Sequence, residues 1–303
     1  MAIYNRLNEH LKKKFGERVL KICVDAGFSC PNRDGTCGVG GCIFCDEYGS
    51  GKNMQCLSIR EQVLSFLNSY RGKRANKFIV YFQNFSNTYD AISKLKKKYD
   101  EALNTSDKIV GMSIATRPDC INDGVAKLLA SYTKKYYVEV ELGLQTANEE
   151  TAKLINRGYN LQTFLEAVET LNRYHIDVVV HIMVGLPNES ITDVLNTVDI
   201  VNNYKINGIK IHSTYVVDNT KLCQMYRSNN YKALELQDYI FTVGEVLKNL
   251  RPDIVIHRLS GDAPKDRLVA PSWNAHKKWV INGIDKYLRD NNIYQGQCYK
   301  NKN

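Results

Sequence analysis

The stretch CPNRDGTCGVGGCIFCDEYGSG, residues 30–51, contains the densest concentration of chemically reactive side chains in this 303-residue chain. Four cysteines, Cys30, Cys37, Cys42 and Cys45, fall within sixteen residues, separated mainly by glycine and polar residues. Glycine and aspartate at this density predict a loop. Thiols crowded into one loop of a chain without secretory features favour a metal or an iron–sulfur cluster over disulfides.

The pair Cys42 and Cys45 forms a CxxC turn, which directs two thiolates to one metal centre. A 4Fe–4S cluster is held by cysteine thiolates, usually four, so three protein thiolates leave one iron open to another ligand. A structural zinc ion bound by all four cysteines is the alternative. Zinc ribbons usually pair two CxxC turns, whereas this loop has one. Cys37 could also replace Cys30 as the first ligand.

The five cysteines outside this set are scattered and lack partners in the sequence. We expect them to be small buried apolar residues. They are Cys23, Cys56, Cys120, Cys223 and Cys298.

The spacing Cys30-x11-Cys42-x2-Cys45, with Phe44 before the last cysteine, resembles the cluster motif of the radical S-adenosylmethionine (SAM) superfamily. The usual first gap in that superfamily is three residues. The segments around the cysteines, FSCPNRDGT and GGCIFC, resemble those of a bacterial group with a long first gap, the YtqA/YhcC-like proteins. That group lies near the catalytic subunit of Elongator, and its best-understood member is the tRNA wobble-uridine enzyme MnmL.

This resemblance implies a 4Fe–4S cluster on Cys30, Cys42 and Cys45, with SAM bound at the open iron through its amino and carboxylate groups. Phe44 would lie near the adenine of SAM. Electron transfer into the cluster would split SAM into methionine and a 5′-deoxyadenosyl radical, which abstracts hydrogen from an unactivated carbon. The implied partners are tRNA and an electron donor such as flavodoxin or ferredoxin. The implied reaction converts carboxymethylaminomethyl to aminomethyl on C5 of the wobble uridine.

Strand and helix patterns alternate along the chain, which predicts a mostly parallel sheet with right-handed crossovers. Apolar runs predict strands at 18–24, 77–83, 108–116, 137–146, 177–187, 208–217 and 253–261. Helical spacing predicts helices at 3–14, 58–70, 91–103, 123–132, 148–156, 161–174, 189–203, 220–226, 234–250 and 273–291. The resemblance implies a partial (β/α)6 TIM-type barrel with an N-terminal helix. We expect a catalytic core over residues 1–217 and a C-terminal extension over 218–303 that covers the barrel.

Polar residues at the carboxyl ends of the predicted strands are the candidate cofactor contacts, because this edge of a parallel α/β sheet is the usual functional position. Gln83 begins QNFSNT, where the superfamily has a Gly-Gly-Glu-like segment. Gln145 and, twelve residues later, Arg157 resemble a glutamine–arginine pair that contacts SAM in related branches. A guanidinium suits the SAM carboxylate, but Arg157 could instead complement a helix C-terminus. His181 is either a SAM contact or a core histidine.

Glu141 lies within a predicted barrel strand, where a carboxylate is costly unless it is paired. It either contacts a ligand or forms a structural bridge to an arginine. Further polar residues are predicted on the substrate side of the barrel mouth, although the loop 257–273 could simply cover the barrel. These candidates are Arg117, His212, Tyr215, His257, Arg258, Lys265, Arg267 and Trp273.

The composition fits an enzyme with one full core, since 44% of the residues are hydrophobic. No run approaches the roughly 20 apolar residues of a membrane span, and the N-terminus lacks a signal-peptide pattern. We therefore expect a cytoplasmic protein. The net charge of +9 fits a polyanionic partner such as RNA or a generic lysine-rich surface. A radical SAM enzyme acting on a small metabolite or peptide, and a non-catalytic zinc module, are the alternatives to a tRNA enzyme.

Overall fold

The computed structural model describes residues 3–47, 49 and 57–300. Residues 48, 50 and 51 of the predicted cluster loop lie outside this range, as does Cys56. Seven parallel strands form one curved sheet, which confirms the predicted α/β half-barrel. In spatial order the strands are β1 (Val19–Val24), β2 (Lys77–Phe82), β3 (Ile109–Thr116), β4 (Tyr137–Gln145), β5 (Asp177–Val184), β6 (Gly208–Ser213) and β8 (Val255–Arg258).

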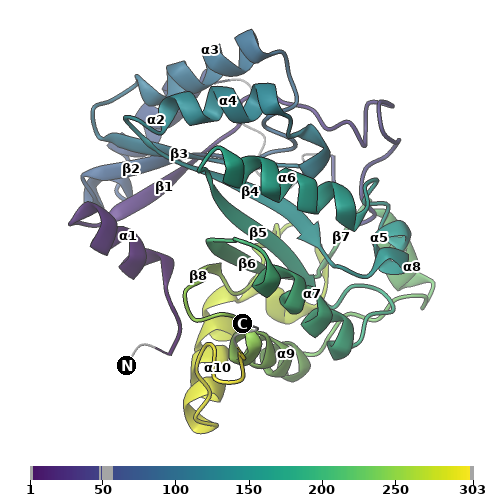
Figure 1. Ribbon diagram of the computed structural model, residues 1–303. Coiled ribbons are helices and arrows are strands. Elements are labelled where there is room, and N and C mark those ends of the chain that lie inside the picture. Colours follow the sequence, from purple (N-terminus) through teal and green to yellow (C-terminus); the bar gives the residue numbers. More distant parts are fainter. Residues whose placement is uncertain (1–2, 48, 50–56, 301–303) are drawn as a thin grey trace.

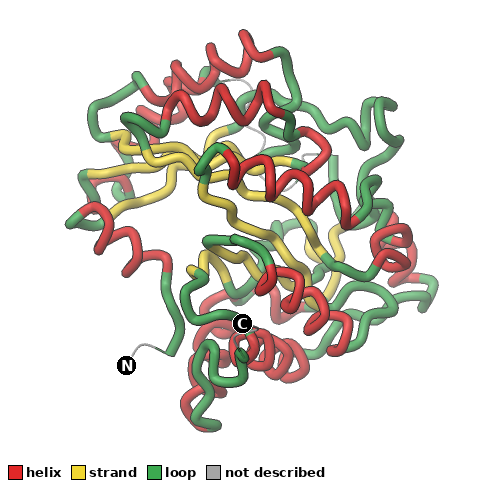
Figure 2. The backbone as a smooth tube through the Cα atoms, viewed as in Figure 1, coloured by secondary structure: helices red, strands yellow, loops and turns green. Residues whose placement is uncertain are grey.

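Helices surround the outer face of this sheet, while its inner face curves around the interior (Figures 1 and 2). The described helices are α1 (Leu7–Phe15), α2 (Ile59–Asn68), α3 (Ile92–Leu103), α4 (Asp123–Tyr132), α5 (Glu149–Leu154), α6 (Leu161–Arg173), α7 (Ile191–Asn203), α8 (Lys221–Arg227), α9 (Leu236–Asn249) and α10 (Lys277–Asp290), and not all of them lie on this face. None of the described helices is long and apolar enough to cross a membrane.

Alternation along the strands separates an apolar outer face from a polar inner face, because successive side chains of a strand point to opposite sides. In β4 the valines and leucines at 138, 140, 142 and 144 join the main core with the helices. Their neighbours Glu139 and Glu141 belong to a hydrogen-bonded polar cluster instead. In β6, Ile209 and Ile211 pack in the core while Lys210 joins the polar cluster. The polar residues are therefore presented to the interior of the barrel.

The N-terminal segment closes one end of the barrel between its two edge strands, β1 and β8. Asn5 accepts a backbone hydrogen bond from Ile256 at 2.7 Å, and Arg6 forms an isolated parallel bridge with Ile256. Helix α1 follows, and its Leu11 packs with Val19 of β1 and Ile79 of β2. The free edge of β8 is thus covered, and apolar side chains seal the bottom of the interior.

Several element boundaries differ from the predictions in the second half of the chain. The predicted strand 208–217 is two strands, because the chain leaves the sheet after Ser213 and its residues Val216–Val217 form β7. β7 pairs in an antiparallel way with β9 (Leu268–Ala270), which the sequence did not indicate. The region after residue 217, predicted as an extension, supplies β8, the seventh strand of the main sheet.

The predicted burial of the scattered cysteines is confirmed for two of them and wrong for two others. Cys120 and Cys223 are buried, whereas Cys23 and Cys298 are exposed. Cys23 lies on β1, an edge strand of the half-barrel, so its side chain is not enclosed by neighbouring strands on both sides. Cys298 follows the last helix on the protein surface.

Gln295 is predicted to stabilise the closure of the barrel through hydrogen bonds to three backbone groups. Its amide nitrogen donates to the carbonyls of Arg251 (2.7 Å) and Ile254 (2.8 Å), and its amide oxygen accepts from Asn5 N at 2.9 Å. The side chain is 6% exposed. Gln295→Ala should lower the free energy of unfolding by about 2–3 kcal/mol, because buried backbone groups lose their partners. Urea denaturation measures this change.

Gln297→Ala is the matched control, because Gln297 lies two residues away and is exposed. It should change the free energy of unfolding by no more than about 0.5 kcal/mol. Equal changes in the free energy of unfolding for the two substitutions would contradict the stabilising role of the Gln295 hydrogen bonds.

Candidate active site

One cavity of about 220 Å³ opens at the carboxyl ends of strands β2 to β6, next to the cysteine loop. We call it the inner cavity. Its lining joins the cysteine loop to the strand tips and to the polar interior of the barrel. The lining residues are Cys30, Arg33, Gly41, Cys42, Phe44, Cys45, Gly49, Tyr81, Gln83, Phe85, Ser86, Ala115, Thr116, Arg117, Glu141, Gly143, Gln145, Tyr159, His181, Met183, His212, Ser213 and Tyr215.

The cysteine loop is held in place by hydrogen bonds from its polar and glycine-rich sequence. Cys45 N donates to Cys42 O at 3.0 Å, which closes the CxxC turn. The Asn32 amide nitrogen donates to Asn156 O at 2.7 Å and lies 3.9 Å from the Cys42 sulfur. Asn156 in turn donates to Gly41 O at 2.7 Å. The loop is therefore anchored to the segment that follows α5.

Three of the four loop cysteines, Cys30, Cys42 and Cys45, line the inner cavity, whereas Cys37 is exposed and does not. An interaction between the thiols of Cys42 and Cys45 lowers the pKa of Cys42 and raises that of Cys45. Arg117 and Arg33 also lower the pKa of Cys42, so cationic side chains are in place to stabilise thiolates.

Three cysteines of the loop share the inner cavity, whereas a structural zinc site usually has four protein ligands. Three thiolates can hold a 4Fe–4S cluster and leave one iron without a cysteine ligand. The donor set that lines the cavity therefore fits a 4Fe–4S cluster.

The predicted cofactor contacts Phe44, Gln83, Gln145 and His181 all line the inner cavity. Gln145 ends β4 with a positive φ of 58°, and its amide oxygen accepts from Tyr159 Oη at 3.0 Å. Tyr159 also donates to Gly143 O at 2.7 Å. A Cβ at Gly143 would lie 2.5 Å from the Gln145 amide nitrogen, so a larger residue there would displace the Gln145 side chain.

The structure does not bring Arg157 to the cavity surface. Arg157 is fully buried, and its guanidinium donates to the carbonyls of Leu144 (2.8 Å), Thr146 (2.7 Å) and Tyr159 (2.9 Å). These bonds hold the end of β4 in its turn. Arg117 does line the cavity. It donates to both oxygens of Asp119 and to Arg157 O, and its guanidinium lies 4.7 Å from the Tyr159 ring centre.

A network of buried charges forms the floor of the inner cavity. We call it the interior ion network, and its members come from five strands. Glu141 on β4 is its centre, because Lys21 lies 2.8 Å from one oxygen and His181 lies 2.7 Å from the other, which Lys210 also contacts. The Ser113 hydroxyl lies 2.7 Å from Glu139 and 2.8 Å from Glu141, so its one hydrogen is shared between the two carboxylates. The predicted bridge from Glu141 to an arginine is therefore replaced by two lysines and a histidine.

The pKa values of this network follow from burial and from the number of opposite charges that each group contacts. Burial would raise the pKa of Glu141, but Lys21 and Lys210 lower it well below its usual range. Burial lowers the pKa of Lys210 to about 8, since one carboxylate offsets it only in part. Lys21 contacts both Glu139 and Glu141, and its pKa is raised. Burial lowers the pKa of His181 to about 4, so its ring is neutral and donates from Nε2 to Glu141.

The candidate substrate residues fall into two groups. Arg117, His212 and Tyr215 line the inner cavity, whereas His257, Arg258, Lys265 and Arg267 do not. His257 is half-buried and lies close to Glu139 and Glu141. Lys265 is exposed, and Arg267 binds Asp46 of the cysteine loop at 2.8 Å. Trp273 packs on Tyr239 and donates to Leu234 O at 2.9 Å, so it is part of the packing around the main core.

The sequence analysis missed several cavity residues that lie beside the predicted ones. Arg33 and Phe85 contact each other, with the guanidinium 5.5 Å from the ring centre. Ser86 is fully buried and has no partner for its hydroxyl except the nearby Cys120 thiol, a weak hydrogen-bonding group. Ser86 and Phe85 belong to the segment QNFSNT, which the sequence places at the end of a predicted strand. That position was the signal from which these two cavity residues could have been predicted.

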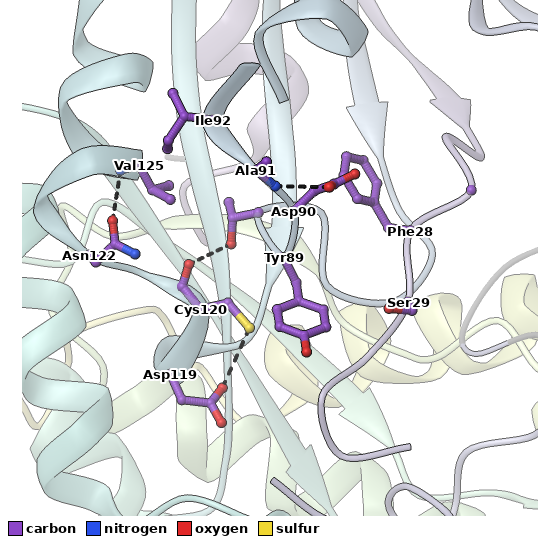
Figure 3. Close-up of a pocket in the computed structure, with 12 residues that line it drawn as sticks. Phe28, Ser29, Tyr89, Asp90, Ala91, Ile92, Asp119, Cys120, Asn122 and Val125 are labelled. Atoms are coloured by element: carbon purple, nitrogen blue, oxygen red, sulfur yellow. Dashed lines mark hydrogen bonds between the residues drawn. The ribbon is translucent and has the colours of Figure 1, made fainter. Parts of the chain in front are cut away.

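A second hollow, of about 650 Å³, is lined by Phe28, Ser29 and the starts of α3 and α4 (Figure 3). Its carboxylates already have partners: Asp119 binds Arg117 at 2.6 Å and Asp90 lies 3.5 Å from Lys94. It contains none of the predicted site residues. The inner cavity is therefore the candidate active site.

Comparison with known proteins shows to which family this chain is similar. The family model described as the Radical SAM superfamily matches residues 32–201, and the Radical SAM C-terminal domain matches residues 206–290. The "Uncharacterized protein YtqA" of Bacillus subtilis is 37% identical over 98% of this chain and 93% of its own length. "Protein YhcC" of Escherichia coli K12 is 33% identical over 96% of this chain and 94% of its own.

A solved structure with a similar fold is the archaeal Elp3 of Methanocaldococcus infernus. It superimposes with a TM-score of 0.67 at 18% sequence identity, over 91% of this chain and 64% of that chain. At this identity the likeness concerns the fold, and this chain spans slightly less than two thirds of the Elp3 chain.

Glu141→Gln tests whether the interior ion network stabilises the barrel. The substitution keeps the shape of the side chain but leaves Lys210 and Lys21 without one of their buried counter-charges. We expect the free energy of unfolding to fall by about 3–5 kcal/mol, measured by urea denaturation. Glu150→Gln is the control, because the Glu150 side chain is 83% exposed and its pair with Lys153 is on the surface. A loss below about 1 kcal/mol for Glu141→Gln would show that the network does not hold the sheet together.

Proposed function

The chain belongs to the radical SAM superfamily, and from this premise we propose that Cys30, Cys42 and Cys45 hold its cluster and that it modifies the wobble uridine of tRNA. The cofactors of this family are a 4Fe–4S cluster and SAM. The observation that supports the cysteine assignment is their position: these three line the inner cavity and Cys37 does not. When bound, the cluster and SAM supply reductive cleavage of SAM to methionine and a 5′-deoxyadenosyl radical.

The protein's own residues would bind and orient the reactants and keep water out of the cavity. Arg117 and Arg33 place positive charge near the thiols. Gln83, after β2, and Gln145, at the end of β4, offer amide groups on either side of β3, and Tyr159 fixes the orientation of Gln145. Phe44 and Met183 provide apolar surface suited to the flat adenine ring. His181 is held by Glu141, so it is oriented before any ligand arrives.

The tRNA assignment rests on the resemblance to the MnmL group and on features that suit RNA. The chain has a net charge of +9. At the start of α10, Trp279 is 65% exposed and stacks on His276 with ring centres 4.2 Å apart. Lys277 and Lys278 lie between them in sequence. An exposed aromatic pair beside lysines suits base stacking and phosphate contact.

We propose that the segment after residue 217 forms the substrate side of the site. Asn274, three residues before α10, accepts a hydrogen bond from Ser213 of the inner cavity at 2.5 Å. The aromatic pair, His276 and Trp279, therefore follows within five residues of Asn274, which is bonded to the cavity wall. The family requires a one-electron reductant, for which flavodoxin or ferredoxin is our proposal.

Single alanine substitutions test the ligand assignment. Cys30→Ala, Cys42→Ala and Cys45→Ala should each strongly reduce the iron and sulfide bound after anaerobic reconstitution, because a cluster with two protein thiolates is poorly held. Production of 5′-deoxyadenosine from SAM and dithionite should fall to background.

Cys37→Ala and Cys298→Ala serve as controls, since both thiols are exposed. They should keep the iron content and the SAM cleavage of the unmodified protein. Loss of iron in Cys37→Ala, with iron retained in Cys30→Ala, would assign the first ligand to Cys37. Stoichiometric zinc without iron would support the zinc module.

The tRNA substrate is tested by incubating the reconstituted enzyme with SAM, dithionite and tRNA that carries 5-carboxymethylaminomethyluridine. Nucleoside analysis should show loss of this nucleoside and formation of 5-aminomethyluridine, with the Cys42→Ala protein as the inactive control. SAM cleavage with unchanged wobble nucleosides would disprove the substrate assignment, leave the radical chemistry intact and favour a small metabolite or peptide.

A further inference from the structure

His212 on β6 lines the inner cavity and carries an unsatisfied polar atom. Its Nε2 has almost no accessible surface and has no hydrogen-bond partner within the part of the chain that the structure describes. The ring lies 5.0 Å from that of His181, whose Nε2 is already bonded to Glu141. A buried nitrogen without a partner is destabilising, so groups of this kind usually meet a ligand.

Cations dominate the surroundings of His212. Lys210 precedes it by two residues on the same strand and therefore on the same face. Arg258 on β8 is in register with Lys210. Arg258 binds Asp262 at 3.2 Å, and this carboxylate is shared with Lys277 at 2.7 Å.

Of the permanent charges that act on the His212 ring, two are cations, Lys210 and Arg258, and one is a carboxylate, Glu141. Glu141 is shared with Lys21 and His181, and Asp262, the partner of Arg258, is 51% exposed to solvent. The field at the His212 ring is therefore positive. Burial first, and then His181, Arg258 and Lys210, hold the pKa of His212 well below its ordinary value, so the ring is neutral in a positive field.

We propose that this end of the inner cavity is a carboxylate subsite, in which His212 receives an anionic group of the substrate with Lys210 and Arg258 behind it. A carboxylate would accept a hydrogen bond from the tautomer of His212 that is protonated on Nε2, and the positive field of Lys210 and Arg258 would attract it. Its identity as part of the substrate rests on the proposed function, because the carboxymethylaminomethyl group ends in a carboxylate. The subsite would bind the form that carries this group and release the aminomethyl product, which lacks it.

Glu141, on the floor of the cavity, differs from His212 in its hydrogen bonding. Lys21, Lys210 and His181 already bind the two carboxylate oxygens of Glu141, so this side chain is not available to a ligand. His212 is the neighbouring group with an unused nitrogen. A cationic or neutral ligand group at this position would add to the excess positive charge or leave it unmatched, whereas an anion compensates it.

The test uses reconstituted enzyme with SAM and two anticodon stem-loop RNAs that differ only at the wobble base. One carries 5-carboxymethylaminomethyluridine and the other 5-aminomethyluridine. We expect the first RNA to bind at least about tenfold more tightly, the scale of one charge-assisted hydrogen bond. His212→Leu should reduce this preference to about threefold or less, while SAM affinity stays unchanged.

His10→Leu is the matched control. His10 lies on α1, at the end of the barrel closed by Leu11, and does not line the inner cavity. It should keep the full preference between the two RNAs. If His212→Leu weakens SAM binding instead of the RNA preference, the carboxylate belongs to the cofactor and the subsite is wrongly assigned. If both RNAs bind His212→Leu with the original preference, the subsite does not exist.

A second measurement separates failure of the subsite from failure of the tRNA assignment. N-methylglycine carries the same carboxymethylamino group, and N-methylethanolamine replaces its carboxylate by a hydroxymethyl group. With 15N-histidine-labelled enzyme, N-methylglycine alone should shift the ring signals of His212, identified by their absence in His212→Leu. Such a shift with no binding of either RNA supports the subsite and disproves the tRNA assignment. No shift, together with equal binding of the two RNAs, disproves the subsite.

Discussion

The contact of Glu141 with Lys21 and Lys210 is the interaction on which the interior of this half-barrel depends. Lys21 lies on β1, the first strand of the sheet, and Lys210 on β6, the sixth in spatial order, so one carboxylate on β4 links strands across the concave face. Two lysines and two glutamates balance in charge, which makes burial of the group tolerable. Removal of any one member leaves a buried charge without compensation.

This network also explains why the concave face can hold ligands. A barrel interior filled with branched apolar residues would be a packed core. Here the bottom is apolar and sealed by α1, the middle is the interior ion network, and the space above it is the inner cavity. The cavity is thus bounded by a floor whose hydrogen bonds are largely complete. Polar groups of a ligand must find partners on the walls, at the strand tips and in the cysteine loop.

The sequence allowed the fold to be predicted and a candidate site to be proposed, because both leave local signals. Strand–helix alternation predicted every strand of the main sheet, and the CxxC loop indicated the functional end. The runs VEVELGLQ (138–145) and GIKIHS (208–213) alternate apolar and polar residues, a pattern typical of a strand with a polar face. The ion-pair partners of Glu141 could not be predicted from the sequence, because Glu141 contacts Lys21 and Lys210 only when strands far apart in sequence curve toward each other.

The two arginines near Tyr159 show where sequence reasoning reaches its limit. Arg157 and Arg117 are both placed near strand ends by their sequence, and their side chains have the same chemistry. The left-handed turn at Gln145 leaves the carbonyls of Leu144 and Thr146 without strand partners. The Arg157 guanidinium donates hydrogen bonds to both carbonyls. Arg117 remains at the cavity wall with Asp119 as its counter-ion. Which arginine faces a ligand is therefore decided by the backbone conformation of a single residue. The same reasoning applies to the histidines, since His181 is committed to Glu141 and His212, one strand further, is left with an unused nitrogen.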